Sequence, residues 1–142
     1  MINSASIFVD TSGFKAVFDK DDDFHSPAIK FWRTAQLEKI HLITSNFILD
    51  ETYTLLRSHM GKDAALSFRQ DIFESIQQLK IIRIIPQDEA QAWKYFEKLP
   101  GRGVSFTDCT SFSIMKRLKL ETAFTFDNDF ATAGFTISPG VQ

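Results

Sequence analysis

The chain has 142 residues, of which 44% are hydrophobic and 24% charged, a composition typical of one globular domain. Its net charge of −2 excludes a strongly basic, non-specific nucleic-acid binder, although an acidic protein can still hold a polyanion through metal ions. A single cysteine, Cys109, excludes an internal disulfide and favours the cytoplasm, and the absence of a long apolar run or a signal-peptide pattern predicts no membrane association.

Strand and helix signals alternate along the chain. Short apolar runs that end at turn residues indicate strands, and apolar residues spaced three and four apart indicate amphipathic helices. In chain order we expect a strand over 5–9, helices over 14–18 and 26–38, a strand over 40–44, helices over 47–59 and 62–79, a strand over 81–85, helices over 88–99 and 107–118, and strands over 122–126 and 135–137. Strands separated by helices require crossover connections, which predicts a single α/β domain over residues 1–142 with a mainly parallel sheet of four to five strands.

Three local patterns refine this prediction. The continuous apolar sequence over 81–85 is typical of a central or well-covered strand. The acidic run over 19–23 is typical of a solvated loop, and Phe73 and Leu79 extend the apolar face of the helix expected over 62–79. Ligand sites in parallel α/β folds lie at the carboxyl ends of the strands, so the residues that follow the strands are the first candidates for a site.

Two aspartates directly follow predicted strands. Asp10 comes after the first strand and Asp127 after the fourth, so both are expected at the same edge of the sheet. Each is equally consistent with a purely structural role, because aspartate commonly forms turns and helix N-caps in short strand-to-helix loops. Asp129 competes with Asp127 for the same place, and we favour Asp127 because it follows the strand without a gap.

Two further acids lie on predicted helices. Glu51 shares a helix side with Ile48 and Leu55, so it faces the protein, where a carboxylate needs either a basic partner or a cation. Asp108 opens the helix over 107–118, and the spacing Ser105-x-x-Asp108 matches a capping box. Asp108 therefore has two alternative interpretations, a helix cap and an acid that projects into the same cleft.

Four acids brought together would repel one another unless a cation neutralises them. Ligands that are all oxygen, with no histidine or cysteine cluster, favour Mg²⁺ or Mn²⁺ over zinc. Such a site suits phosphodiester hydrolysis, because a divalent cation acidifies water and stabilises the leaving oxygen. The residue pattern thus predicts a metal-dependent hydrolase.

Four motifs together resemble PIN-domain ribonucleases, in particular VapC-type toxins of toxin–antitoxin pairs. They are F-V-D-T-S-G at 8–13, L-D-E-T-Y-T-L-L at 49–56, S-F-T-D-C at 105–109 and T-F-D-N-D-F at 125–130. The resemblance implies a three-layer α/β/α sandwich with strand order 3-2-1-4-5 and Mg²⁺- or Mn²⁺-dependent cleavage of RNA. It also implies an antitoxin partner and a homodimer.

By motif, the resemblance assigns the acidic quartet to Asp10, Glu51, Asp108 and Asp127. It makes Asp10 and Asp108 the firmest metal ligands, lets Glu51 and Asp127 complete the shell or activate water, and gives Thr125 a role in orienting a ligand or water. Cys109 stands where many relatives have a small alanine, and we expect it to pack in the core.

Two questions stay open at the level of the sequence. Arg102 lies between glycines just before Asp108, where it either contacts a phosphate of the RNA or is an ordinary surface arginine. The alternative function is a PIN-like module that binds RNA or protein without cleavage, and an intact acidic quartet argues against it. Phosphoaspartate enzymes and receiver domains fit poorly, because Ser12 and Ile85 stand where those folds need a second aspartate or a phosphoacceptor.

Overall fold

The computed structural model describes residues 6–139, so Ala5, the first residue of the strand predicted over 5–9, lies outside the described part. A five-stranded sheet with the order β3-β2-β1-β4-β5 forms its centre, and every strand pair is parallel. This order and the α/β class agree with the predictions from the sequence. The elements in chain order are β1 (Ser6–Val9), α1 (Thr11–Phe18), α2 (His25–Leu37), β2 (His41–Ser45), α3 (Asn46–Met60), α4 (Lys62–Glu74), β3 (Leu79–Ile82), α5 (Pro86–Lys98), α6 (Phe106–Arg117), β4 (Thr122–Thr125), α7 (Asp129–Thr132) and β5 (Thr136–Pro139).

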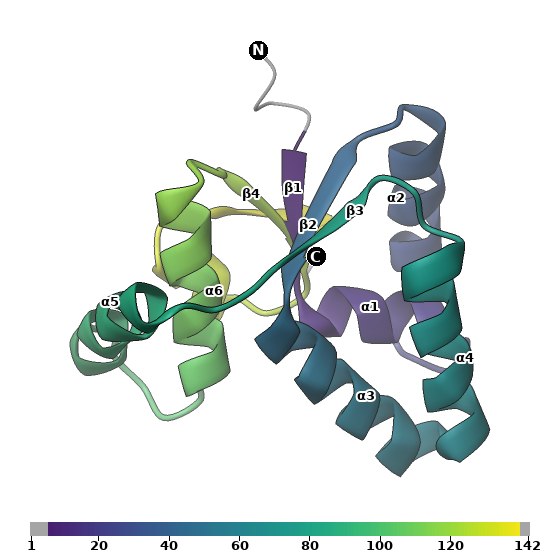
Figure 1. The fold of residues 1–142 in the computed structure, drawn as a ribbon, viewed down its shortest axis with the longest axis horizontal. Coiled ribbons are helices and arrows are strands. Elements are labelled where there is room, and N and C mark those ends of the chain that lie inside the picture. The colour runs from purple at the N-terminus through teal and green to yellow at the C-terminus, as the bar shows by residue number, and fades with distance from the viewer. Residues whose placement is uncertain (1–5, 140–142) are drawn as a thin grey trace.

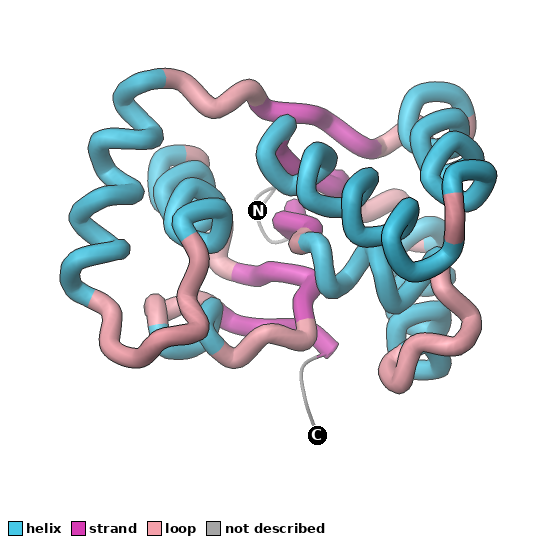
Figure 2. The backbone as a smooth tube through the Cα atoms, turned by 90° about the horizontal axis from the view of Figure 1, so that it is seen from below, coloured by secondary structure: helices cyan, strands magenta, loops and turns pink. Residues whose placement is uncertain are grey.

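Helices cover both faces of the sheet. Helices α5 and α6 lie on one side of the strands, and α1, α2 and α4 lie on the other (Figure 1). Seen from below, α3 lies in front of the strands (Figure 2). Within residues 6–139, no helix combines the length and the apolar character needed to cross a membrane. The core between the layers is rich in phenylalanine, with full burial of Phe8, Phe14, Phe68, Phe112, Phe124 and Phe130.

The pairing of β1 with β4 brings the first motif, at 8–13, next to the last motif, at 125–130. Phe8 pairs with Ala123, so the residues that follow both strands emerge side by side. Gly13 lets α1 approach this pair closely, because a Cβ atom at this position would lie 2.6 Å from the carbonyl oxygen of Phe124. The glycine of the F-V-D-T-S-G motif is therefore required by packing, and it holds the start of α1 against β4.

Local capping fixes the position of α3, the helix that carries Glu51. The Ser45 hydroxyl accepts a hydrogen bond from the Ile48 backbone N–H at 3.1 Å, which caps the first turn. The helix ends at Gly61, whose φ of 97° lies in the region that favours glycine. Both ends of α3 thus follow from residues that are readable in the sequence.

The helix predicted over 62–79 and the strand predicted over 81–85 have different boundaries in the structure. Helix α4 ends at Glu74, and Leu79 belongs to β3, where it pairs with Leu42 of β2. Strand pairing overrides the helical spacing of the apolar residues at this point. The expectation of a central or well-covered strand is wrong on both counts, because β3 is an edge strand and none of its residues is fully buried. Phe73, which the helical spacing predicted to be buried, is 62% exposed.

Two segments near the strand ends differ from the sequence prediction. The predicted solvated loop over 19–23 contains a buried residue, Asp19, whose carboxylate forms an ion pair with Lys15 at 2.7 Å. The short helix α7 was not predicted, and it directly follows Asp127 and Asn128. Both segments border the site described next.

Candidate active site

Four acidic residues from separate elements line one open pocket at the carboxyl ends of the strands. Asp10 follows β1, Glu51 lies on α3, Asp108 lies in the first turn of α6, and Asp127 comes shortly after β4. The pocket has a volume of about 480 Å³. The structure therefore gathers the four acids that the sequence analysis singled out, although they are far apart in the chain.

Asp10 is held by hydroxyl groups rather than by a basic residue. It is 3% exposed and occupies the N-cap position of α1, but its side chain makes no capping hydrogen bond. The hydroxyls of Thr125 and Ser12 both donate to its Oδ2 atom, at 2.8 and 3.0 Å. Burial raises the pKa of Asp10 to about 6, although these hydrogen bonds favour the ionised form. The turn and N-cap interpretation thus does not account for the Asp10 side chain.

The same two hydroxyls connect the turn after β1 to the turn after β4. Ser12 Oγ accepts a hydrogen bond from the Phe126 N–H at 2.9 Å, and Thr125 Oγ1 accepts one from the Asp127 N–H at 3.0 Å. Thr125 was expected to orient a ligand or water, and it contacts Asp10 directly. The sequence analysis missed Ser12, and its only signal was its place in the turn two residues after Asp10.

Asp108 both caps a helix and faces the pocket. Its Oδ2 accepts the Ser105 N–H at 3.1 Å, while the Ser105 hydroxyl accepts the Asp108 N–H at 2.9 Å, which is the predicted capping box. Burial, together with the neighbouring charges of Asp10, Asp127 and Glu51, raises the pKa of Asp108 to about 7. The two interpretations of Asp108 are therefore compatible.

Asp127 and Asp129 both approach Asp108. One carboxylate oxygen from each of the three residues lies within 4.8 Å of the others. Asp127 lines the pocket, and its Oδ1 accepts the Asp129 N–H at 2.9 Å. Burial and the adjacent Asp127 raise the pKa of Asp129. The preference for Asp127 as the fourth acid stays a prediction, since the geometry brings both near Asp108.

Glu51 is half-buried and is fixed by a hydroxyl. Thr11 Oγ1 donates to Glu51 Oε1 at 2.5 Å, and within residues 6–139 no lysine or arginine forms an ion pair with Glu51. Among the described residues, the alternative that Glu51 pairs with a lysine or arginine is therefore not supported. Arg102 is exposed and does not line the pocket, whereas Lys15, which the sequence could not place, does line it.

The donor set fits a hard divalent cation. The acidic and hydroxyl side chains of the pocket offer oxygen ligands, which suit Mg²⁺ and Mn²⁺, while Lys15, which also lines it, is paired with Asp19 and Asp22. The raised pKa values of Asp10 and Asp108 reflect burial and mutual repulsion, and a cation between these groups would relieve both effects. Cys109, next to Asp108, is not part of this set, because it is buried and its pKa is raised to about 11.

A parallel α/β sandwich with acids gathered at its strand ends defines the class to which this chain belongs. The sequence profile of the PIN domain matches residues 7–136, and the chain is a member of the PIN domain family. The 23S rRNA-specific endonuclease VapC20 of Mycobacterium tuberculosis is 33% identical over 129 residues, which cover 91% of this chain and 95% of that protein.

Solved structures show the same fold. The crystal structure of Mycobacterium tuberculosis VapC20, described as a sarcin–ricin loop cleaving toxin, superposes with a TM-score of 0.82 at 32% identity, over 92% of this chain and 96% of that chain. VapBC2 from Rickettsia felis, bound to a promoter DNA fragment, superposes with a TM-score of 0.66 at 15% identity, over 94% of this chain and 97% of that chain. The second similarity concerns the fold alone.

Proposed function

We propose that this protein is a metal-dependent endoribonuclease and the toxin of a type II toxin–antitoxin pair. The observation that carries the proposal is that Asp10, Glu51, Asp108 and Asp127 share one pocket without a basic residue paired to any of them among the described residues. The similarity to VapC20 supports RNA as the substrate and makes 23S rRNA the first candidate. The site of action would be the cytoplasm.

In this proposal Asp10, Asp108 and Asp127 hold Mg²⁺ or Mn²⁺, and Glu51 completes the shell or holds a water molecule. The chemistry that a bound divalent cation supplies is charge neutralisation and the acidification of water for attack on the phosphodiester. The chain itself supplies positioning: Thr125 and Ser12 fix Asp10, and Thr11 fixes Glu51. These hydroxyls keep the acidic groups in place before substrate binds, so little reorganisation is needed during the reaction.

A cleavage assay on purified ribosomal RNA, with and without Mg²⁺ or Mn²⁺, tests the nuclease proposal. Asp10→Asn and Asp108→Asn should each reduce the cleavage rate on the order of a hundredfold or more, because they remove ligand charge. Asn at 108 keeps an oxygen for the Ser105 N–H, so the helix cap is retained. Asp50→Asn is the matched control, since Asp50 is an exposed acid next to Glu51. Metal-independent cleavage, or RNA binding without cleavage, would contradict the proposal.

The toxin role has its own test. Expression of the chain alone should arrest growth, and Asp108→Asn should relieve the arrest at equal protein level. We expect a cognate antitoxin to cover the acidic pocket and to place a basic side chain among its carboxylates, and we expect the protein to form a homodimer. Unimpaired growth at confirmed expression would refute the toxin role and leave the nuclease proposal to its own assay.

A further inference from the structure

One wall of the acidic pocket is aromatic. Phe24 and Phe126 line the pocket together with the acids. Their rings stack face to face, with centroids 4.6 Å apart and an interplanar angle of 9°. Phe126 is 7% exposed, whereas Phe24 is 37% exposed. Phe126 is therefore the inner ring of the pair, and Phe24 is the outer ring that the solvent reaches.

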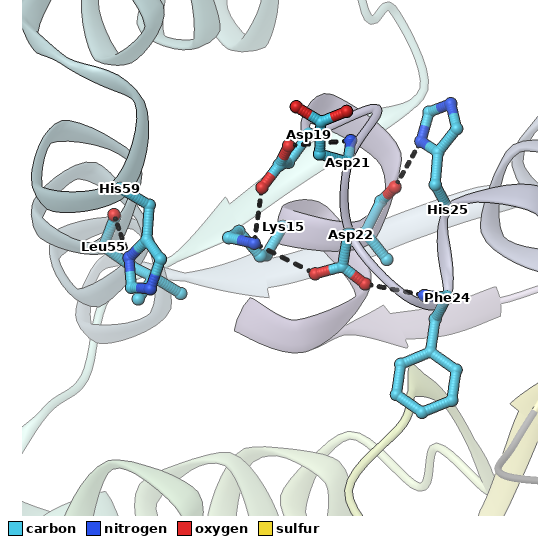
Figure 3. A network of polar contacts seen from close by, with 9 residues as sticks. Lys15, Asp19, Asp21, Asp22, Phe24, His25, Leu55 and His59 are labelled. Carbon is cyan, nitrogen blue, oxygen red and sulfur yellow. Dashed lines mark hydrogen bonds and ion pairs between the residues drawn. The ribbon is translucent and has the colours of Figure 1, made fainter.

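The turn that carries Phe24 is held rigidly by charged side chains (Figure 3). Lys15 Nζ binds both Asp19, at 2.7 Å, and Asp22, at 3.0 Å. The second oxygen of Asp22 accepts the Phe24 N–H at 2.9 Å, and His25 Nδ1 contacts the Ala16 carbonyl oxygen at 2.7 Å. The Phe24 backbone is thus fixed before any ligand arrives, which lowers the entropic cost of using the ring for binding.

The other exposed aromatic residues do not share this setting. Trp93 and Phe96 of α5 pack against each other and against Phe106, and none of the three lines the acidic pocket. Phe73 lies on α4, also outside the pocket. Among these exposed aromatic residues, Phe24 is therefore the one that lies beside the carboxylates. A solvent-accessible phenyl ring at this place suits a ligand with an apolar, planar group.

We propose that Phe24, stacked on Phe126, is a platform for an unpaired RNA base next to the scissile phosphate. The inference rests on the proposed nuclease function. A single-stranded nucleic acid carries both charged phosphates and flat bases, and the pocket offers a group for each: acids that would bind a phosphate through cations, and the partly exposed ring of Phe24. Lys15 is a positioning residue in this arrangement, because it holds the turn through Asp19 and Asp22.

The test measures binding by fluorescence anisotropy with two labelled probes in Ca²⁺: a random single-stranded RNA of about 12 nucleotides and an abasic ribose-phosphate strand of equal length. Phe24→Ala and Phe24→Leu should weaken RNA binding by about fivefold to a hundredfold and leave abasic-strand binding unchanged. Phe24→Trp should retain RNA binding. Phe73→Ala, which removes an exposed ring that does not line the pocket, is the matched control. Thermal melting of each variant establishes that it is folded.

The leucine variant separates stacking from apolar contact. If Phe24→Leu binds RNA as the wild-type protein does, the ring is only an apolar contact, suited to a protein partner, and the proposal is overturned. Equal affinity of the wild-type protein for RNA and for the abasic strand, or no binding of either, also overturns it. A different result would refute only the nuclease function. In that case the wild-type protein does not cleave RNA in Mg²⁺ or Mn²⁺, but it still binds RNA more tightly than the abasic strand and this preference requires Phe24.

Discussion

Replacing Asp10 by asparagine should make the metal-free protein more stable although it sharply reduces the cleavage rate. Asp10 is 3% exposed, and burial raises its pKa from 3.8 to about 6. The ionised carboxylate therefore destabilises the folded state at neutral pH, by about 3 kcal/mol at 1.36 kcal/mol for each pKa unit. Asparagine fits the same space and keeps an oxygen that can accept the Thr125 hydroxyl.

The sign of the pH dependence follows from the direction of the shift. Because the pKa of Asp10 is raised in the folded state, the folded protein binds more protons than the unfolded chain between pH 4 and 6. The wild-type protein should thus lose stability as the pH rises through this window, and Asp108, whose pKa is raised to about 7, extends the loss to neutral pH. Asp10→Asn should remove the Asp10 part of this slope.

Urea and thermal unfolding of the metal-free proteins from pH 4 to 8 measure the effect. At pH 7.5 Asp10→Asn should melt roughly 6–12 °C higher than the wild-type protein, and at pH 4 the two should coincide. Asp50→Asn, which removes an exposed carboxylate, should stay within about 0.5 kcal/mol of the wild type. Mn²⁺ should stabilise the wild-type protein far more than Asp10→Asn. If Asp10→Asn is less stable than the wild-type protein at pH 7.5, the view that the ionised Asp10 carboxylate destabilises the metal-free folded state is refuted.

Three other substitutions or treatments test the supporting structure. Gly13→Ala should lower the unfolding free energy by about 1–3 kcal/mol in chemical denaturation, because its Cβ would overlap the Phe124 carbonyl oxygen; an unchanged value would contradict the close packing. Arg117→Ala should lower the unfolding free energy by about 2–4 kcal/mol, because it removes the ion-pair partner of the Asp88 carboxylate, which is 2% exposed. Arg117→Lys should recover part of this stability, and an unchanged unfolding free energy in Arg117→Ala would contradict the role of the pair. Cys109, buried with a pKa raised to about 11, should react with a thiol reagent only after unfolding, and fast labelling of the native protein would argue against its burial.

The site was predictable in outline because a general rule of topology links strand ends to ligand sites. Asp10 and Asp127 follow β1 and β4, and these strands are neighbours in the sheet, so two residues far apart in the chain meet at one edge. Asp108 was predictable from its capping box, which places the carboxylate at the start of α6. These signals are local, and that is why the sequence carries them.

The features that sequence analysis missed depend on tertiary contacts. Strand β3 begins at Leu79 because it pairs with β2, and helical spacing alone continued the helix to that point. The hydroxyl of Ser12 matters only because the turn after β4 lies beside it. Likewise, Phe24 and Phe126 are separated by most of the chain, and no local pattern signals that their rings stack.

The central claim is that carboxylates from distant parts of the chain converge to hold a divalent cation. Crystals of the wild-type protein soaked in Mn²⁺ test it most directly through the anomalous signal of the metal. The account predicts an anomalous peak for an Mn²⁺ ion about 2.0–2.3 Å from carboxylate oxygens of Asp10 and Asp108. The peak should be absent from Asp10→Asn crystals that are soaked in the same way. An empty pocket at an Mn²⁺ concentration that supports RNA cleavage, or a peak bound elsewhere, would contradict it.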